Sequence, residues 1–199
     1  MKKLSLVLIL FVLTINQINA NTYSSDPKMF VSELVNDVVN KLSDKNLNEE
    51  EKSTHLEKIA IENVDINALG LYTLGELRKS LSKNELVKYQ NTFEKYFLKS
   101  LTSRLTEYSN DKFKVISDEI KSSNYTMVKS LIEKSENKPE IKIDWRIYTK
   151  NPDKPLIRDL IVEGLSLART QKEEFASILN SNNNDINILI EKLENFVNE

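Results

Sequence analysis

The polar residues best suited to catalysis are two aspartates in alternating, strand-type segments of the chain. Asp144 lies in IKIDWRIY and Asp159 lies in LIRDLIVE. A buried carboxylate can act as a general base, so a small-molecule enzyme with a cup-shaped α+β pocket and either aspartate as its base is one hypothesis for the function. Both aspartates fall on the polar side of their segments, next to basic residues, and an ion-paired or hydrated strand face explains them better.

Other common catalytic and metal-binding patterns are missing from the sequence. The chain has no cysteine and one histidine, His55, which lies among polar helical residues, so a zinc site is not expected. Gly164-Leu165-Ser166 lacks the flanking glycines of a nucleophile elbow, and there is no glycine-rich phosphate loop. We therefore expect no catalytic residue, no metal site and no cofactor.

The composition indicates a packed and largely helical protein. The chain has 199 residues, of which 40% are hydrophobic, with three glycines and four prolines. These values favour a folded domain with a core over a disordered chain. The formal net charge is −2, and lysine and glutamate are interspersed, so no basic stripe marks a nucleic-acid surface. Nucleic acid is therefore not an expected partner.

The first twenty residues have the pattern of a secretory signal. Lys2 and Lys3 precede an apolar run over residues 4–15, and the small Ala20 stands at the expected cleavage point. The run is too short to span a bilayer comfortably, which argues against the alternative of a membrane anchor. No cysteine stands near the cleavage point, so a lipoprotein anchor is excluded. We expect residues 1–20 to be a cleaved signal peptide and residues 21–199 to form a single domain held by core packing.

Helical periodicity dominates the first part of the chain. Asp26 and Pro27 have the residue types of a helix start, and apolar residues then recur at helical spacing. Ser82 and Glu85 form a capping box ahead of a long helix with an aromatic face that extends toward Tyr108. Further helices are predicted over residues 48–61, from Asp65, after a second capping box at Thr170 and Glu173, and over residues 186–197.

From Phe113 onward the periodicity changes from helical to alternating. Strands are predicted over residues 113–117, 125–132, 141–148 and 156–163. Short turns separate them, which implies antiparallel neighbours. In the last strand, the alternation predicts that the side chains point to two opposite sides of the sheet. One side has Leu156, Arg158, Leu160 and Val162, and the other has Ile157, Asp159, Ile161 and Glu163. Helices, then strands, then helices predict an α+β fold in which several helices cover a bent antiparallel sheet of about four strands.

The end of the last strand resembles a known family. Asp159, Glu163, Gly164 and Ser166, followed by TQKEEF, are similar to the Asp-x-x-x-Glu-Gly-x-Ser signature of the MlaC (toluene-tolerance) family of periplasmic phospholipid-binding proteins. The segment over residues 64–108 also resembles this family. The matching residues there are Leu74, Gly75, Phe93 and Tyr108; Arg78 and Leu101 depart from it, where many members have Trp and Tyr.

The resemblance implies a function and a set of partners. It implies a periplasmic phospholipid carrier that shuttles lipid between the outer and inner membranes and helps to maintain outer-membrane lipid asymmetry. The implied partners are an outer-membrane lipoprotein complex and an inner-membrane ABC lipid transporter with its hexameric lipid-binding ring. The carrier would be a monomer with phospholipid as its cargo and no other cofactor. A structural or chaperone-like protein with an exposed apolar groove is a third alternative.

The family's fold also implies a deep apolar pocket between the sheet and the helices. A bent sheet and one long helix can bring together one large apolar set, which we predict to contact lipid. Its members are Phe93, Phe97, Leu101, Ile141, Ile143, Trp145, Ile147, Leu160 and Val162. Headgroups need water and are expected at the rim of this pocket.

Overall fold

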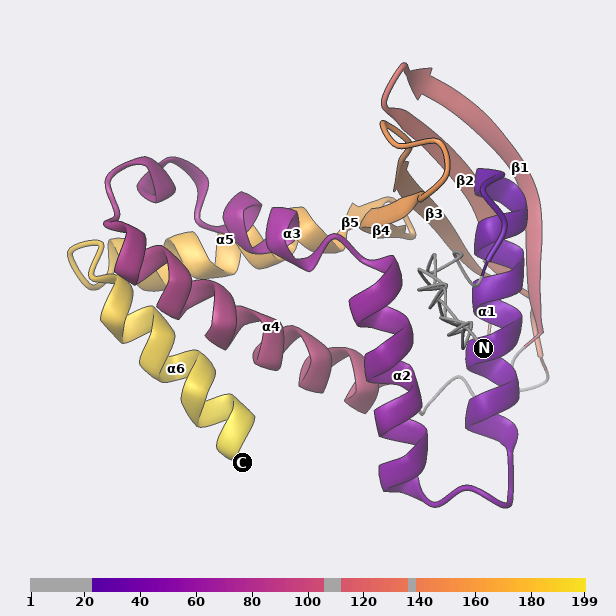
Figure 1. The fold of residues 1–199 in the computed structure, drawn as a ribbon, viewed down its shortest axis with the longest axis horizontal. Coiled ribbons are helices and arrows are strands. Elements are labelled where there is room, and N and C mark those ends of the chain that lie inside the picture. The colour runs from indigo at the N-terminus through magenta and orange to yellow at the C-terminus, as the bar shows by residue number, and fades with distance from the viewer. Residues whose placement is uncertain (1–22, 106–111, 136–138) are drawn as a thin grey trace, which may run out of the picture.

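The computed structural model describes residues 23–105, 112–135 and 139–199, and it has the α+β architecture predicted above (Figure 1). The first helices are α1 (Pro27–Ser43), α2 (Glu49–Asn63), α3 (Ile66–Thr73), the 3₁₀ helix η1 (Gly75–Lys79) and α4 (Lys83–Leu105). The strands are β1 (Phe113–Ser122), β2 (Tyr125–Ile132), β3 (Ile141–Tyr148), β4 (Leu156–Val162) and β5 (Leu165–Ser166), followed by helices α5 (Leu167–Asn180) and α6 (Ile186–Asn198). The predicted signal peptide and Tyr108 lie outside the described residues.

The strands form one antiparallel sheet in the order β1-β2-β3-β4-β5, in which each strand pairs with its neighbour in the sequence. The short strand β5 adds to the four strands that were predicted. β1 is longer than its prediction and continues to Ser122. In Figure 1, β1 curves around α1, so the sheet is bent as expected.

Two of the predicted helix starts are confirmed at the level of hydrogen bonds. The Asp26 carboxylate accepts a hydrogen bond from the Met29 amide at 2.8 Å, and Pro27 is the first residue of α1. Before α4, the Ser82 amide donates to Glu85 at 2.8 Å and the Glu85 amide donates to the Ser82 hydroxyl at 3.3 Å. These contacts satisfy backbone N–H groups that have no partner within the helix.

The predicted start of α5 is wrong. The helix begins at Leu167, and its cap is Ser166, whose hydroxyl accepts a hydrogen bond from the Arg169 amide at 3.0 Å. Thr170 therefore lies inside the helix, where its hydroxyl donates to the Ser166 carbonyl at 3.1 Å. Because Ser166 also ends β5, α5 leaves the sheet with no intervening loop and starts one turn earlier than the capping-box pattern indicates.

The alternation predicted for β4 is also wrong, because the strand contains a bulge. Arg146 of β3 lies opposite Asp159, whereas the next residue, Ile147, lies opposite Ile157. Arg158 is the extra residue, and such an insertion changes which side of the sheet the following side chains occupy. Ile157 is buried on the side that faces α1, while Arg158 and Asp159 both contact residues of the opposite side.

One side of the sheet packs against α1. The hydrophobic residues at this contact form a group that we call the sheet cluster. Its buried members are Tyr23, Phe30, Val31, Leu34, Val35, Val128, Trp145, Ile147 and Ile157. Within it, the Trp145 indole N–H donates to the Ser130 hydroxyl at 2.8 Å, and that hydroxyl donates to the Ile143 carbonyl at 2.9 Å. The one polar atom of the buried indole is thereby satisfied, as burial requires.

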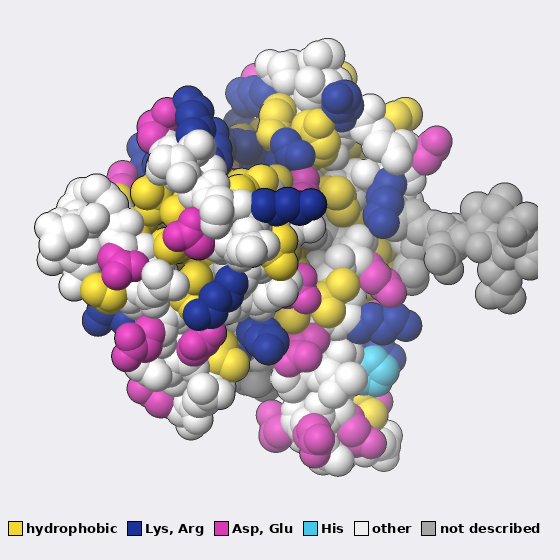
Figure 2. All heavy atoms as spheres, turned by 60° about the vertical axis from the view of Figure 1, so that its left-hand side comes forward, with side chains coloured by type: hydrophobic (Ala, Val, Ile, Leu, Met, Phe, Trp, Pro, Cys, Tyr) yellow, Lys and Arg dark blue, Asp and Glu magenta, His cyan; other side chains and the backbone are white. Residues whose placement is uncertain are grey.

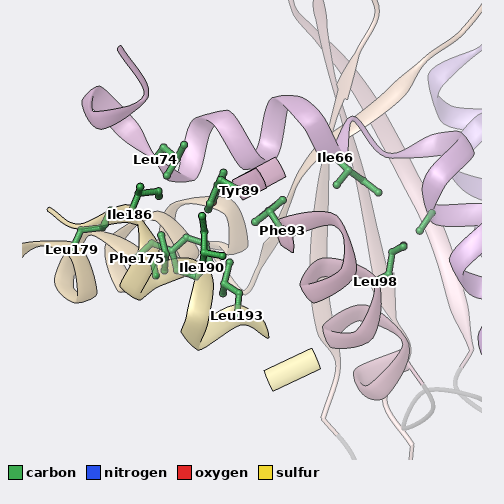
Figure 3. Close-up of a cluster of buried hydrophobic side chains, with 12 residues drawn as sticks. Ile66, Leu74, Tyr89, Phe93, Leu98, Phe175, Leu179, Ile186, Ile190 and Leu193 are labelled. Atoms are coloured by element: carbon green, nitrogen blue, oxygen red, sulfur yellow. The ribbon is translucent and has the colours of Figure 1, made fainter. Parts of the chain in front are cut away.

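A second group, the helix cluster, lies between α3, α4, α5 and α6 (Figure 3). Its buried members are Ala60, Ile66, Leu74, Tyr89, Phe93, Leu98, Phe175, Leu179, Ile186, Leu189, Ile190 and Leu193. The Phe93 ring stacks on Tyr89 and meets Phe175 edge-on, with ring centroids 5.8 and 6.3 Å apart. The Tyr89 hydroxyl lies 2.7 Å from the Thr73 hydroxyl, so this buried polar group is paired.

The two clusters meet at the connection between α2 and α3. Val64 packs against both of them and forms an isolated parallel bridge with Ile157 of β4. The next residue, Asp65, donates its amide to the Ile157 carbonyl at 2.9 Å. This connection therefore joins the helices to the sheet.

Candidate functional site

An open pocket of about 630 Å³ lies between α3 and the side of the sheet that faces away from α1. Its lining residues are Ala68, Leu69, Tyr72, Lys121, Ser122, Tyr125, Thr126, Met127, Arg146, Arg158 and Ala168. They come from α3, from the ends of β1 and β2, from β3 and β4, and from the start of α5. The pocket is thus a product of the tertiary fold.

The apolar part of the pocket comes mainly from α3. Ala68, Leu69 and Tyr72 lie on this short helix, whose start is capped by the Asp65 carboxylate accepting a hydrogen bond from the Ala68 amide at 3.2 Å. Met127 of β2 faces them from the sheet. Leu69 also packs against the helix cluster, so the apolar wall of the pocket continues into the interior between the helices.

The basic part of the pocket consists of Lys121, Arg146 and Arg158, and no aspartate or glutamate is among its lining residues. Each cation has an acidic partner that lies outside the lining. Lys121 pairs with Glu119 at 2.7 Å, and Arg146 lies 3.5 Å from Asp159. The pocket therefore presents three basic side chains next to an apolar wall, and each of them also pairs with a carboxylate that is not a lining residue. On the face shown in Figure 2, Lys and Arg side chains border hydrophobic ones in the upper part, and acidic side chains gather lower down.

Arg158 is the most tightly held of the three cations. Its Nε donates to Asp65 Oδ2 at 2.8 Å, its Nη2 lies 2.7 Å from the same oxygen, and its Nη1 donates to the Tyr125 hydroxyl at 2.8 Å. The guanidinium carbon lies 3.4 Å from the centroid of the Tyr148 ring, a cation–π contact. Burial lowers the pKa of Arg158, but the hydrogen bonds to Tyr125 and Asp65 outweigh it, and the net shift is upward. Arg158 is a fixed positive charge.

Asp159, one of the two aspartates considered as a catalytic base, is a buried structural group. It is 3% exposed, and its two oxygens accept hydrogen bonds from the Ser166 hydroxyl at 2.6 Å and from the Ala168 amide at 3.0 Å. These contacts tie β4 to the start of α5. The paired strand face expected from the sequence is therefore present at Asp159. Asp144 is half-buried on β3, opposite Lys129 and Ile161.

None of the nine residues predicted to contact lipid lines this pocket. Phe93, Phe97 and Leu101 belong to the helix cluster or pack against it; Ile143, Trp145, Ile147 and Leu160 do the same in the sheet cluster. Ile141 and Val162 are half-buried on the strands next to Ile132 and Ile143. The structure thus assigns seven of the nine residues to the two clusters, both of which Val64 contacts, and the contact of all nine with lipid stays a prediction.

The pocket residues were missed because their strand positions look like a solvent-exposed polar face. Tyr125, Met127 and Arg146 alternate with buried residues of β2 and β3, whereas Arg158 was predicted on the side of Leu160 and reaches the pocket side through the bulge. The signal that could have indicated a site is the presence of arginine and tyrosine together on that face, since both residue types are enriched where proteins bind ligands and partners.

No group of three or more His, Cys, Asp or Glu side chains is arranged to hold a metal ion within the part of the chain that is described. Among the described helices, none is both long enough and apolar enough to cross a bilayer.

The fold and sequence were compared with known proteins. The fold is similar to the solved structure of the phospholipid-binding protein from Ralstonia solanacearum in complex with a phospholipid, with a TM-score of 0.70 and 18% sequence identity over 84% of this chain and 94% of that chain. No curated protein shows a significant sequence match. The family model described as MlaC protein matches residues 31–195. Because this match covers most of the sequence, and because the signature at the end of β4 agrees with it, the chain belongs to the MlaC family.

Proposed function

We propose that this protein binds phospholipid and carries it through the periplasm between the outer and inner membranes. The observation that carries the proposal is the pocket with one apolar wall and one basic wall, in a chain that belongs to the MlaC family. A phospholipid has the matching chemistry, with apolar chains and a charged phosphate. The structural neighbour from Ralstonia solanacearum, which has the same fold, was solved with a phospholipid bound.

A carrier must shield the acyl chains from water. Two chains contain on the order of thirty methylenes. At about 0.8 kcal/mol for each methylene, exposure of these chains to water would cost roughly 20 kcal/mol or more. The open pocket, at about 630 Å³, has the size typical of sites for much smaller ligands. We therefore propose that it takes the headgroup and glycerol, and that the chains continue past Leu69 into the apolar interior between the two clusters.

The proposal includes a location and partners. The signal-type pattern of residues 1–20 supports export to the periplasm. A carrier of this kind would receive and deliver lipid at an outer-membrane lipoprotein complex and at an inner-membrane ABC transporter with a hexameric lipid-binding ring. In this way it would help to maintain outer-membrane lipid asymmetry. Mature protein is expected to begin near Asn21 in the soluble periplasmic fraction, and N-terminal sequencing of that fraction checks the location.

Mass spectrometry of lipid extracted from the purified protein tests the function directly. Protein expressed with its leader and purified without detergent should contain phospholipid in near-stoichiometric amount. After removal of that lipid, the protein should take up phospholipid from vesicles. If the purified protein contains no lipid and also takes none from vesicles, the carrier proposal is wrong.

A further inference from the structure

We propose that Lys121, Arg146 and Arg158 form a phosphate-binding subsite that selects phospholipids with a net negative charge over zwitterionic ones. The identity of the ligand as a lipid rests on the function proposed above. The subsite itself rests on the geometry of the pocket, in which these three cations are lining residues and no carboxylate is.

The three cations converge because of the sheet topology. Lys121 lies at the end of β1, Arg146 lies on β3, and Arg158 is the bulge residue of β4. A regular β4 would place Arg158 on the α1 side of the sheet, together with Leu160. The bulge instead places its guanidinium beside the Tyr125 and Tyr148 rings, on the pocket side. The bulge thus supplies the third positive charge of the site.

Each cation keeps hydrogen-bonding capacity for a ligand. An arginine has five N–H donors, and the described contacts of Arg158 use three of them, two toward Asp65 and one toward Tyr125. Lys121 is 48% exposed at its side chain, and Arg146 is 44% exposed and 3.5 Å from its acidic partner. A phosphate has several acceptor oxygens and forms charge-assisted hydrogen bonds with such donors, which are stronger than neutral ones.

The absence of a carboxylate from the lining provides the selectivity. A zwitterionic headgroup such as that of phosphatidylethanolamine carries an ammonium group, which would approach three cations without an acidic partner in the lining. The glycerol headgroup of phosphatidylglycerol carries hydroxyls instead, and the hydroxyls of Ser122 and Tyr125 in the lining can pair with them. An anionic glycerol headgroup therefore fits this pocket better.

Lipid exchange with mixed vesicles tests the selectivity. Delipidated mature protein is incubated with equimolar phosphatidylglycerol and phosphatidylethanolamine vesicles, re-isolated, and its lipid quantified by mass spectrometry. Phosphatidylglycerol should be in excess in the wild-type protein. Lys121→Gln and Arg146→Gln should each lower the ratio of bound phosphatidylglycerol to bound phosphatidylethanolamine by about twofold to fivefold, which is the size of effect expected for partly exposed charges. In the double variant, the bound lipid should approach the composition of the vesicles. Added salt should lower the wild-type ratio in the same direction.

Lys114→Gln is the matched control, because it removes the same charge from an exposed position of β1 outside the pocket lining. It should leave the ratio unchanged. Circular dichroism melting shows which variants are folded. If Arg146→Gln does not fold, Lys121→Gln decides the outcome, since its side chain is half-exposed and pairs with the exposed Glu119.

Three results would overturn the inference. In the first, the wild-type protein binds a normal amount of lipid in the same proportions as the vesicles, and the variants do the same. This would show that the basic residues do not select headgroups, while the carrier proposal would stand. Inorganic phosphate that binds in calorimetry and loses affinity in Lys121→Gln, without any change in the lipid ratio, would assign the site to a free phosphate. No lipid of either kind would remove both this inference and the proposed function.

Discussion

Arg158 connects three parts of the molecule through one side chain. It contacts Asp65 ahead of α3, the Tyr125 hydroxyl of β2 and the Tyr148 ring of β3. Its side chain is 25% exposed and that of Asp65 is 18% exposed, so the pair is partly desolvated. Removal of one partner from such a pair leaves the other charge with poorer solvation than in water, which is costly for folding.

Asp65→Asn is the change that separates charge from capping at this position. Asparagine can still accept the hydrogen bond from the Ala68 amide, so α3 keeps its cap. The lost ion pair should lower the free energy of unfolding by about 1 to 2 kcal/mol, between the values for exposed and buried pairs. Urea denaturation measures this change.

Glu76→Gln is the control for Asp65→Asn, since it breaks a solvent-exposed pair with Lys79. It should not move the urea midpoint measurably. Equal effects of the two substitutions would show that the contacts of Arg158 do not stabilise the junction between helices and sheet.

At the scale of elements, the start of α4 depends on a charged cap. The pKa of Glu85 is lowered, first by the hydrogen bond from the Ser82 hydroxyl and then by that from the Ser82 backbone. A carboxyl whose folded pKa is lowered adds stability above its ordinary pKa, and this stability is lost as the pH falls through the lowered value.

Glu85→Gln should therefore destabilise the protein at neutral pH and have little effect in acid. The glutamine can keep the hydrogen bond to the Ser82 backbone but lacks the charge. Thermal melts of both proteins across the acidic range measure the difference. A difference that grows as the pH falls would contradict this account of the cap.

The crossing of α3 and α4 depends on a glycine. A Cβ at Gly70 would lie 2.9 Å from Cδ1 of the buried Phe93 ring, which is closer than a normal contact. Phe93 packs against the Tyr89, Phe97 and Phe175 rings, so its ring cannot move without displacing its neighbours. This close approach positions α3, and therefore one wall of the pocket.

Gly70→Ala should destabilise the protein by about 1 to 3 kcal/mol, because overpacking at a helix crossing displaces side chains of the core. The gain in helix propensity from glycine to alanine is about 1 kcal/mol and opposes this effect only in part. Asn67→Ala on the exposed side of the same helix is the control and should not destabilise. A more stable Gly70→Ala variant would show that Phe93 adapts without cost.

At the scale of the whole molecule, the two clusters and the pocket offer alternative places for acyl chains. The predicted lipid-contact residues lie in the clusters, whereas the pocket opens on the other side of the sheet. The half-buried residues of the predicted set, such as Ile143 and Val162, retain surface that a lipid could cover.

Glutamate substitutions at two places distinguish these alternatives. Ile143→Glu or Val162→Glu should abolish lipid binding if the chains lie on the α1 side of the sheet, because a carboxylate facing acyl chains loses hydration without gaining a partner. Met127→Glu should do so if the chains stay in the open pocket. Ile120→Glu, at a side chain 77% exposed on β1, is the control. Lipid content by mass spectrometry, with a circular dichroism check of folding, is the measurement. Normal lipid content in folded variants at both places would show that the chains contact neither region.

Much of the local structure could be predicted from the sequence, because it depends on residues close together in the chain. Asp26 with Pro27, and Ser82 with Glu85, indicate helix starts through contacts that span three residues. The limits of β2 and β3 agree with the predicted segments, which turn residues bound on both sides. The signature ending at Ser166 indicated the family, which the match over residues 31–195 shows.

Only the tertiary structure decided which side of the sheet each strand residue occupies and where the pocket lies. The bulge at Arg158 depends on pairing with β3, and the start of α5 after its cap Ser166 depends on the end of a strand that forms only within the sheet. The pocket unites α3 with strand residues at least 49 positions away in the sequence, so no local pattern contains it. Periodicity identifies apolar faces, but their contacts depend on non-local packing, whose geometry a single sequence does not show.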